Sequence, residues 1–230
     1  MTKKVPTTDA AGGSSRLRSL LVLAALVLLA ANLRPALTSV APLIGEIRAG
    51  TGVSNGVAGL LTTLPLLAFA LLSPVAPRLA RAIGMRRVLL LSLLALAAGI
   101  LARSSGTLAA LFLGTALLGA AIAVGNVLLP SIVKREFPER VGLMTSVYST
   151  ALGISAALAA GVSAPMAQLV GWRAALALWA IPAFVAAVAW LPWLGSGRTG
   201  SAPEGSHRGV GVLWRSPLAW QVTLFMGLQS

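Results

Sequence analysis

The sequence predicts an all-α membrane protein in which six transmembrane helices form a bundle and a seventh helix begins near the last residue. Of the 230 residues, 57% are hydrophobic and only 10% are charged, whereas soluble domains carry roughly one quarter charged residues. A helix needs about 20 apolar residues to cross the hydrocarbon. Six charge-free runs meet or approach that length: 19–33, 49–77, 88–102, 104–133, 141–172 and 174–197. The runs lack the polar alternation of membrane β-strands, so helices are predicted.

Four regions follow along the chain. Residues 1–15 are polar and rich in Thr, Ser and Gly, which predicts a disordered tail, and residues 16–194 hold the six-helix bundle. Residues 195–217 have the Gly, Ser and Pro content of a flexible linker. Residues 218–230 begin a seventh span that is too short to cross a bilayer, so the sequence resembles the N-terminal half of something larger.

The first and third spans need separate comment. The first apolar stretch continues beyond the length of a signal-peptide core and no soluble domain follows it, so we expect it to remain in the mature protein. The third run, 88–102, is short. Because an arginine at a helix end can extend its charge to the interface, we expect Arg103 to lengthen this span by reaching outward.

Basic residues predict the orientation of the bundle. If the N-terminus is cytoplasmic, Arg48, Arg103 and Arg173 fall on the outer side and Arg34 lies within a span, while the other Lys and Arg fall on the inner side. Such a bias is typical of helices in the cytoplasmic membrane with their basic loops inside. It accounts for the net charge of +13 without a nucleic-acid partner.

Several kinds of chemistry are disfavoured by composition. With no cysteine in the chain, disulfides, thiolate metal sites and cysteine nucleophiles are excluded. The single histidine, His207, lies in a polar loop. Neither a zinc-protease motif nor a phosphate-binding loop is present, so we expect no metal, no cofactor, no catalytic residue and no ATPase in this chain.

Arg34 places a permanent charge inside the first span, in the stretch ANLRPALTSV (31–40). A central arginine costs about 2.5–3.5 kcal/mol on insertion scales, and such residues usually face a bundle interior or a watery cavity. No carboxylate lies inside a predicted span, and Glu46 lies near the outer end of the first. An unpaired guanidinium is suited to a small anion. The alternative is that Arg34 reaches outward or pairs with the missing half.

Pro35 and a set of polar residues accompany Arg34. Proline removes a backbone N–H, which frees a carbonyl and permits a bend. The candidate substrate-binding residues are polar and fall inside predicted spans: Arg34, Asn32, Thr38, Asn126, Tyr148 and Gln229. Polar contacts between helices are an equally good explanation for Asn126 and Tyr148.

Two similar motifs suggest an internal repeat. Asn32-Leu-Arg-Pro35 lies in the first span and Asn126-Val-Leu-Leu-Pro130 in the fourth, and each Asn precedes a glycine of the next span by the same distance. Two three-helix repeats of opposite orientation are common in transporters. With 24 glycines in the chain, coincidence is the alternative.

The loop after the second run, PRLARAIGMRR (77–87), resembles the signature loop of the major facilitator superfamily. That signature is a glycine, any residue, Leu, Ala, Asp, Arg, any residue, Gly and then basic residues. Leu79, Ala80, Gly84 and Arg86 match it, whereas Pro77 and Arg81 stand in place of the first glycine and the aspartate.

Three longer stretches, ANLRPALTSVAPLI, GNVLLPSIVKREFPERVGLMTSVYSTALG and FMGLQS, resemble the cyanate and 2-nitroimidazole transporter family within that superfamily, over about residues 18–230. The resemblance implies twelve spans in two six-helix bundles, with the solute between them and alternating access. A secondary active transporter for a small anionic or polar, cyanate-like solute is therefore the leading hypothesis. A multidrug or antibiotic efflux transporter of the same fold is the alternative, and an intramembrane enzyme is a third. Without the missing half, we expect no transport.

Overall fold

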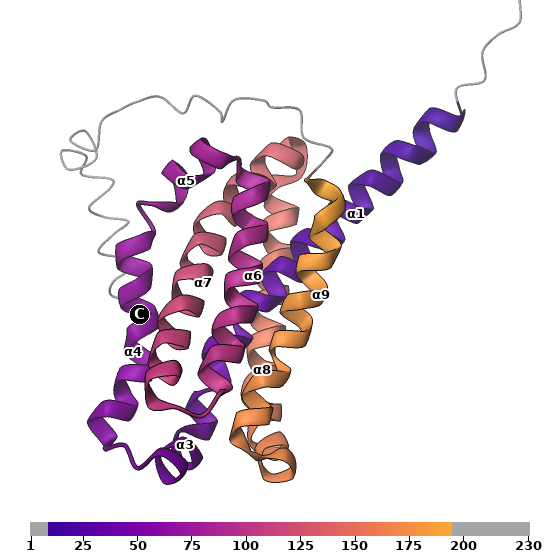
Figure 1. The fold of residues 1–230 in the computed structure, drawn as a ribbon. Coiled ribbons are helices and arrows are strands. Elements are labelled where there is room, and N and C mark those ends of the chain that lie inside the picture. Colours follow the sequence, from indigo (N-terminus) through magenta and orange to yellow (C-terminus); the bar gives the residue numbers. More distant parts are fainter. Residues whose placement is uncertain (1–8, 195–230) are drawn as a thin grey trace, which may run out of the picture. The chain divides into compact units, whose positions relative to one another are not determined.

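A computed structural model describes residues 9–194, with side chains from Leu20 onward. Within these residues the chain is helical and contains no strand (Figure 1). The linker predicted at 195–217, the seventh-span segment at 218–230 and Gln229 lie outside the described residues, as do residues 1–8 of the predicted tail.

The helices follow one another with short connections. In chain order they are α1 (Asp9–Leu33), α2 (Pro35–Thr38), η1 (Ala41–Leu43), α3 (Ile44–Thr51), α4 (Asn55–Leu72), α5 (Ala76–Ile83), α6 (Met85–Ser104), α7 (Leu108–Glu136), η2 (Pro138–Arg140), α8 (Val141–Leu178), α9 (Ala180–Trp190) and η3 (Leu191–Trp193). Helix α1 begins at Asp9, earlier than the boundary predicted at residue 16. Once an apolar helix has formed, each further residue adds a hydrogen bond without a new nucleus.

Five stretches are long and apolar enough to cross a membrane: Leu20–Thr51, Asn55–Leu72, Met85–Ser104, Leu108–Glu136 and Pro138–Trp193. The last contains 56 residues, more than twice the roughly 20 of one crossing. It is interrupted at Gly171, whose φ of 80° and ψ of 155° suit glycine because a side chain would be strained there. The break separates the fifth and sixth spans close to Arg173, where the sequence predicted it. The six-helix membrane bundle is confirmed.

One end of the bundle is tied together by Arg86. Its guanidinium forms an ion pair with Glu136, the last residue of α7, at 2.9 Å. It also donates to the carbonyl oxygen of Trp193 at 3.1 Å, and the indole of Trp190 donates to the Arg86 carbonyl at 3.0 Å. The start of α6, the end of α7 and the end of α9 therefore meet at this end.

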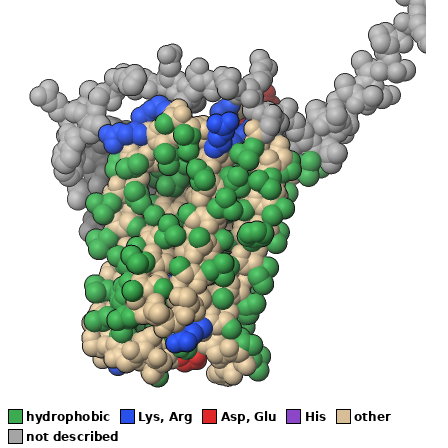
Figure 2. Space-filling model, in the orientation of Figure 1, with side chains coloured by type: hydrophobic (Ala, Val, Ile, Leu, Met, Phe, Trp, Pro, Cys, Tyr) green, Lys and Arg blue, Asp and Glu red, His purple; other side chains and the backbone are tan. Residues whose placement is uncertain are grey.

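The opposite end holds the residues that the charge pattern placed outside. The Arg173 guanidinium stacks 5.2 Å from the Trp172 ring centre and donates to the Gly106 carbonyl at 3.4 Å. Trp172 also lies against Gly50. Figure 2 shows basic side chains gathered toward the two ends and hydrophobic side chains covering the surface between them, as expected for a protein surrounded by lipid.

Helices α6 and α7 approach each other most closely at a pair of glycines. A Cβ atom on Gly99 would lie 2.8 Å from the Leu118 backbone nitrogen, and one on Gly114 would lie 2.6 Å from the Gly99 carbonyl oxygen. Only glycine leaves room for this crossing, as in other membrane bundles. Leu96, Leu118 and their neighbours are fully buried around it.

The expectation for Arg103 is wrong. Its side chain is 1% exposed and lies inside the bundle instead of reaching the interface. The Cα–Cβ bond in a helix tilts toward the N-terminus, so a long side chain on the last turn of α6 points back along the helix. There it finds a carbonyl oxygen on the first span that no helical amide occupies.

Candidate functional site

The candidate site is the interruption of the first span. Helix α1 ends at Leu33 and α2 begins at Pro35, which has no N–H to donate to the carbonyl of the preceding turn. The backbone angles remain helical at Arg34 (φ −98°, ψ −41°), so the chain continues in the same sense with its hydrogen-bond ladder broken. A second proline, Pro42, follows in η1. The first span is therefore a chain of short helical pieces through its middle.

Arg34 occupies this interruption with an exposed side chain. It lies near the middle of the apolar stretch Leu20–Thr51. Its guanidinium makes no ion pair and no hydrogen bond to any residue in the part of the chain that the structure describes. Contact with lipid hydrocarbon would be costly for this charge, so its exposed position requires water, a solute or another protein surface.

Asn32 and Asn126 lie on segments that touch. The side chain of Leu33 fills the space in front of Gly125, where a Cβ would lie 2.7 Å from the Leu33 Cδ2 atom. The Asn32 amide is buried and donates to the Leu28 carbonyl at 2.7 Å. The half-buried Asn126 amide donates in the same way to the Ile122 carbonyl at 3.0 Å. Both side chains thus bond their own helix, four residues back, and keep the other amide hydrogen available.

Thr38 joins the interruption to α8. Its hydroxyl lies 3.2 Å from the carbonyl oxygen of Arg34 and 3.2 Å from that of Ala156. With one hydrogen it donates to one of them at a time. Ala156 and Tyr148 lie on one face of α8, two turns apart. Helix α1 and the first part of α8 run in the same direction. The half-buried Tyr148 therefore lies about one turn nearer than Arg34 to the N-terminal ends of these two helices.

The structure therefore assembles part of the predicted set. It brings the Asn32 and Asn126 segments together at the α1–α7 crossing, and it links Thr38 to the helix that carries Tyr148. It adds Arg103, whose guanidinium donates to the Ala36 carbonyl at 2.6 Å and lies 3.4 Å from the Ser39 hydroxyl. The sequence signal for Arg103 was its position in the last turn of a short span, from which a long side chain can point back along the helix as well as outward.

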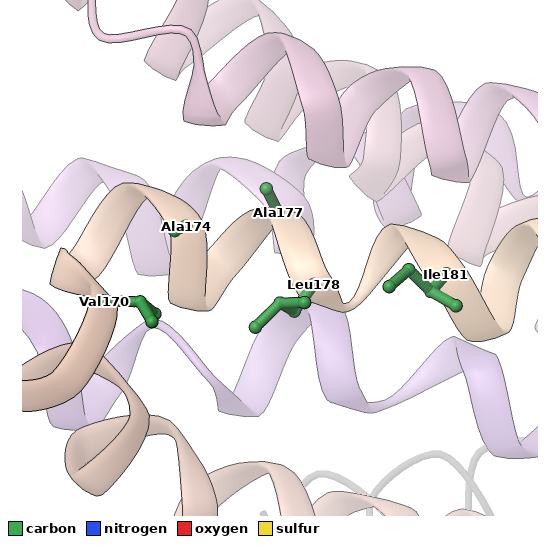
Figure 3. A pocket seen from close by; sticks show the side chains of 5 residues that line it. All are labelled: Val170, Ala174, Ala177, Leu178 and Ile181. Atoms are coloured by element: carbon green, nitrogen blue, oxygen red, sulfur yellow. The ribbon is translucent and has the colours of Figure 1, made fainter.

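A separate groove of about 390 Å³ lies on α8 and α9 (Figure 3). Its lining side chains are apolar: Val170, Ala174, Ala177, Leu178 and Ile181. Such a surface offers no donor or acceptor to a polar solute, in contrast to the interruption of the first span. Within the described residues, no three His, Cys, Asp or Glu side chains are grouped so that they could hold a metal ion.

A polytopic helical bundle whose first span is interrupted at an arginine with no partner among the described residues has the build of a membrane transport protein. The chain belongs to the Major Facilitator Superfamily, whose family model matches residues 20–230.

Three curated relatives are transport proteins by name. The chain is 48% identical over 219 residues to the uncharacterized transporter YycB of Bacillus subtilis (strain 168), which covers 94% of this chain and 54% of that protein. It is 42% identical over 212 residues to the 2-nitroimidazole transporter of Escherichia coli (strain K12), a match that covers 92% of this chain and 54% of that protein. It is 36% identical over 209 residues to the cyanate transport protein CynX of the same strain, a match that covers 90% of this chain and 54% of that protein. The chain therefore spans about half the length of these relatives and belongs with transporters, not enzymes.

Solved structures agree on the fold. A mutant of the peptide transporter POT in complex with alafosfalin superposes with a TM-score of 0.70 at 17% identity, covering 90% of this chain and 46% of that one. The same transporter in complex with sulfate gives a TM-score of 0.69 at 18% identity, and the match covers 90% of this chain and 45% of that one. The described bundle is the N-terminal six-helix unit of a major facilitator fold.

Proposed function

We propose that this chain forms the N-terminal half of a secondary active transporter that moves a small anionic or polar, cyanate-like solute across the cytoplasmic membrane by alternating access. The second six-helix bundle would come from the half of the relatives' length that this chain does not span. The N-terminus would be cytoplasmic. The observation that carries the proposal is the exposed guanidinium of Arg34 at the interruption of the first span, which has no partner in the part of the chain that the structure describes.

The chemistry of the relatives' named solutes supports this reading. Cyanate is a small anion, and a nitroimidazole carries nitro oxygens that accept hydrogen bonds. A guanidinium offers five N–H donors in a fixed fork and can hold either kind of acceptor through two parallel bonds. Thr38, Asn126 and Tyr148 supply neutral groups from three helices, within about one helical turn of the level of Arg34 on either side. We assign them, with Asn32, to the wall of the solute site; Gln229 is proposed as a contributor from the seventh span.

The test replaces Arg34 in the full-length protein and measures cyanate binding by calorimetry after purification. Arg34→Lys keeps the charge without the planar fork and should weaken binding in part. Arg34→Gln removes a charge-assisted bond worth roughly 1.5–3 kcal/mol, which corresponds to about one to two decades in affinity. Arg48→Gln is the matched control, because Arg48 is also exposed but lies in α3, away from the interruption.

Two results would count against the proposal. If Arg34→Gln binds cyanate as tightly as the parent protein, Arg34 is a structural residue and the anion assignment is lost. If the parent protein binds neither cyanate nor 2-nitroimidazole but binds a lipophilic cation such as tetraphenylphosphonium, the multidrug efflux transporter is the better assignment.

A further inference from the structure

Arg103 is the largest fully buried side chain in the described part of the chain. Its guanidinium has two partners, the Ala36 carbonyl oxygen at 2.6 Å and the Ser39 hydroxyl at 3.4 Å. Its Nε atom has no hydrogen-bond partner among the described residues, and no carboxylate there pairs with its charge. Burying a cation on these terms is costly. Because burying this cation costs free energy, we expect the two hydrogen bonds made by Arg103 to have a structural or functional role.

The Ala36 carbonyl is available because the helical pattern of α2 ends at Thr38, before η1 begins at Ala41. In a regular helix this oxygen would accept the N–H of Val40. Here the Val40 amide donates to Leu37 instead, at 3.4 Å, in the tighter pattern of a turn. A carbonyl deprived of its amide inside a membrane must find another donor. The shorter Arg103 bond, assisted by charge, provides one.

The position of Arg103 itself is fixed by the glycine crossing of α6 and α7. A Cβ atom on Gly114 would lie 2.9 Å from the Cα of Arg103. The backbone of α6 at Arg103 is thus held directly against α7, so its guanidinium reaches the first span from a rigid base. Arg103 connects the α6–α7 pair to the interrupted part of the first span.

We propose that Arg103 is a positioning residue that holds the bend between Arg34 and Val40 and thereby fixes the direction in which Arg34 presents its guanidinium. Without Arg103, the Ala36 carbonyl can accept the Val40 amide in the helical pattern, the bend that follows Pro35 changes, and Arg34 turns away from its present direction. The part of this inference that concerns the solute rests on the function proposed above; the part that concerns the bend does not.

The bend is tested by thiol modification. The 230 residues contain no cysteine, so Val40→Cys introduces a single reporter in this segment, at a side chain that is 6% exposed. In full-length protein whose other cysteines have been replaced, a maleimide should react slowly with Val40→Cys. Adding Arg103→Met should accelerate the reaction several-fold, and Arg103→Lys should give an intermediate rate because lysine has one donor group for Ala36. Arg48→Met, at the same end of the bundle, should leave the rate unchanged.

Positioning of Arg34 is tested by a double-variant cycle on cyanate binding. Arg103→Met should weaken binding by roughly tenfold, comparable with the loss of one charged bond. If Arg103 acts only through Arg34, the pair Arg34→Gln and Arg103→Met should bind no more weakly than Arg34→Gln alone. Additive losses would mean that Arg103 acts independently of Arg34 and would overturn the proposal.

If Arg103 only stabilised the fold, its replacement would lower the melting temperature strongly. The positioning role predicts instead that Arg103→Met melts within a few degrees of the parent protein, because removing a desolvated charge offsets the lost hydrogen bonds. If that variant fails to insert, Arg103→Lys carries both measurements. An unchanged Val40→Cys rate in the variants refutes the bend. If cyanate does not bind even the parent, the proposed function fails, and the thiol measurement still decides whether Arg103 holds the bend.

Discussion

Replacing Gly114 with alanine should loosen the bundle where α6 and α7 cross. The added Cβ would lie 2.6 Å from the Gly99 carbonyl oxygen and 2.9 Å from the Arg103 Cα, whereas ordinary contacts begin at 3.4 Å. Both neighbours are backbone atoms, so neither can rotate away. The Arg103 backbone nitrogen would be closer still, so helices α6 and α7 would have to separate by roughly 1 Å, which strains the buried packing around Leu96 and Leu118.

The expected loss is about 1–3 kcal/mol, the usual cost of overpacking a core. For a chain of this size that corresponds to a fall in melting temperature of several degrees. The assay is thermal unfolding of the purified full-length protein in detergent, followed by tryptophan fluorescence. Gly45→Ala is the matched control, because Gly45 is helical and a Cβ there would meet nothing within 4 Å. Removing that glycine should stabilise the helix slightly or have no effect.

Equal melting temperatures for Gly114→Ala and Gly45→Ala would refute the reasoning. They would mean that the two helices either do not approach as closely as described or can shift apart at no cost. A loss for Gly99→Ala similar to that for Gly114→Ala would support it, since a Cβ at Gly99 would meet backbone atoms of Leu118 and Gly114 at 2.8 and 2.9 Å.

Two further predictions concern the ends of the bundle. Glu136→Gln should lower the free energy of unfolding by roughly 1.5–3 kcal/mol, since it removes the charged partner of the mostly buried Arg86. In a double-variant cycle, combining Glu136→Gln with Arg86→Gln should cost less than the sum of the two single losses. Strict additivity would show that the two residues are not coupled. For orientation, a single cysteine at Ser201 should react with an impermeant thiol reagent only after cells are opened, while one at Ser105 should react in intact cells. Reaction of the Ser201 cysteine from outside would reverse the assigned topology.

Local composition was sufficient to predict the crossings and their breaks. Apolar runs of adequate length have few stable alternatives to helices in a membrane, because each backbone polar group must be bonded within its own segment. The interruption at Pro35 was predictable for the same reason, since proline lacks the N–H that a regular helix requires. The break between the fifth and sixth spans was expected near Arg173 and is observed at Gly171.

The partners of polar side chains could not be predicted in this way. Asn32 and Asn126 are far apart in sequence, and their segments meet because Gly125 admits the side chain of Leu33. Thr38 bonds a carbonyl of α8, which depends on how α1 and α8 cross. Helical spacing shows which residues share a face of one helix, but it does not show which face of another helix lies opposite.

Arg103 shows the difference most clearly. The sequence by itself determined that a charge would stand at the end of the third span, and a charge at that position can reach outward to the interface or inward to a polar group. Which way it goes depends on whether a neighbouring helix offers an unoccupied acceptor within reach. Helix α2 ends before the Val40 amide can bond the Ala36 carbonyl, and the crossing of α6 and α7 at Gly114 brings the Arg103 guanidinium within 2.6 Å of that oxygen. Only the packed arrangement of three helices could decide that the arginine points inward, because the bond depends on distances between segments that the sequence separates.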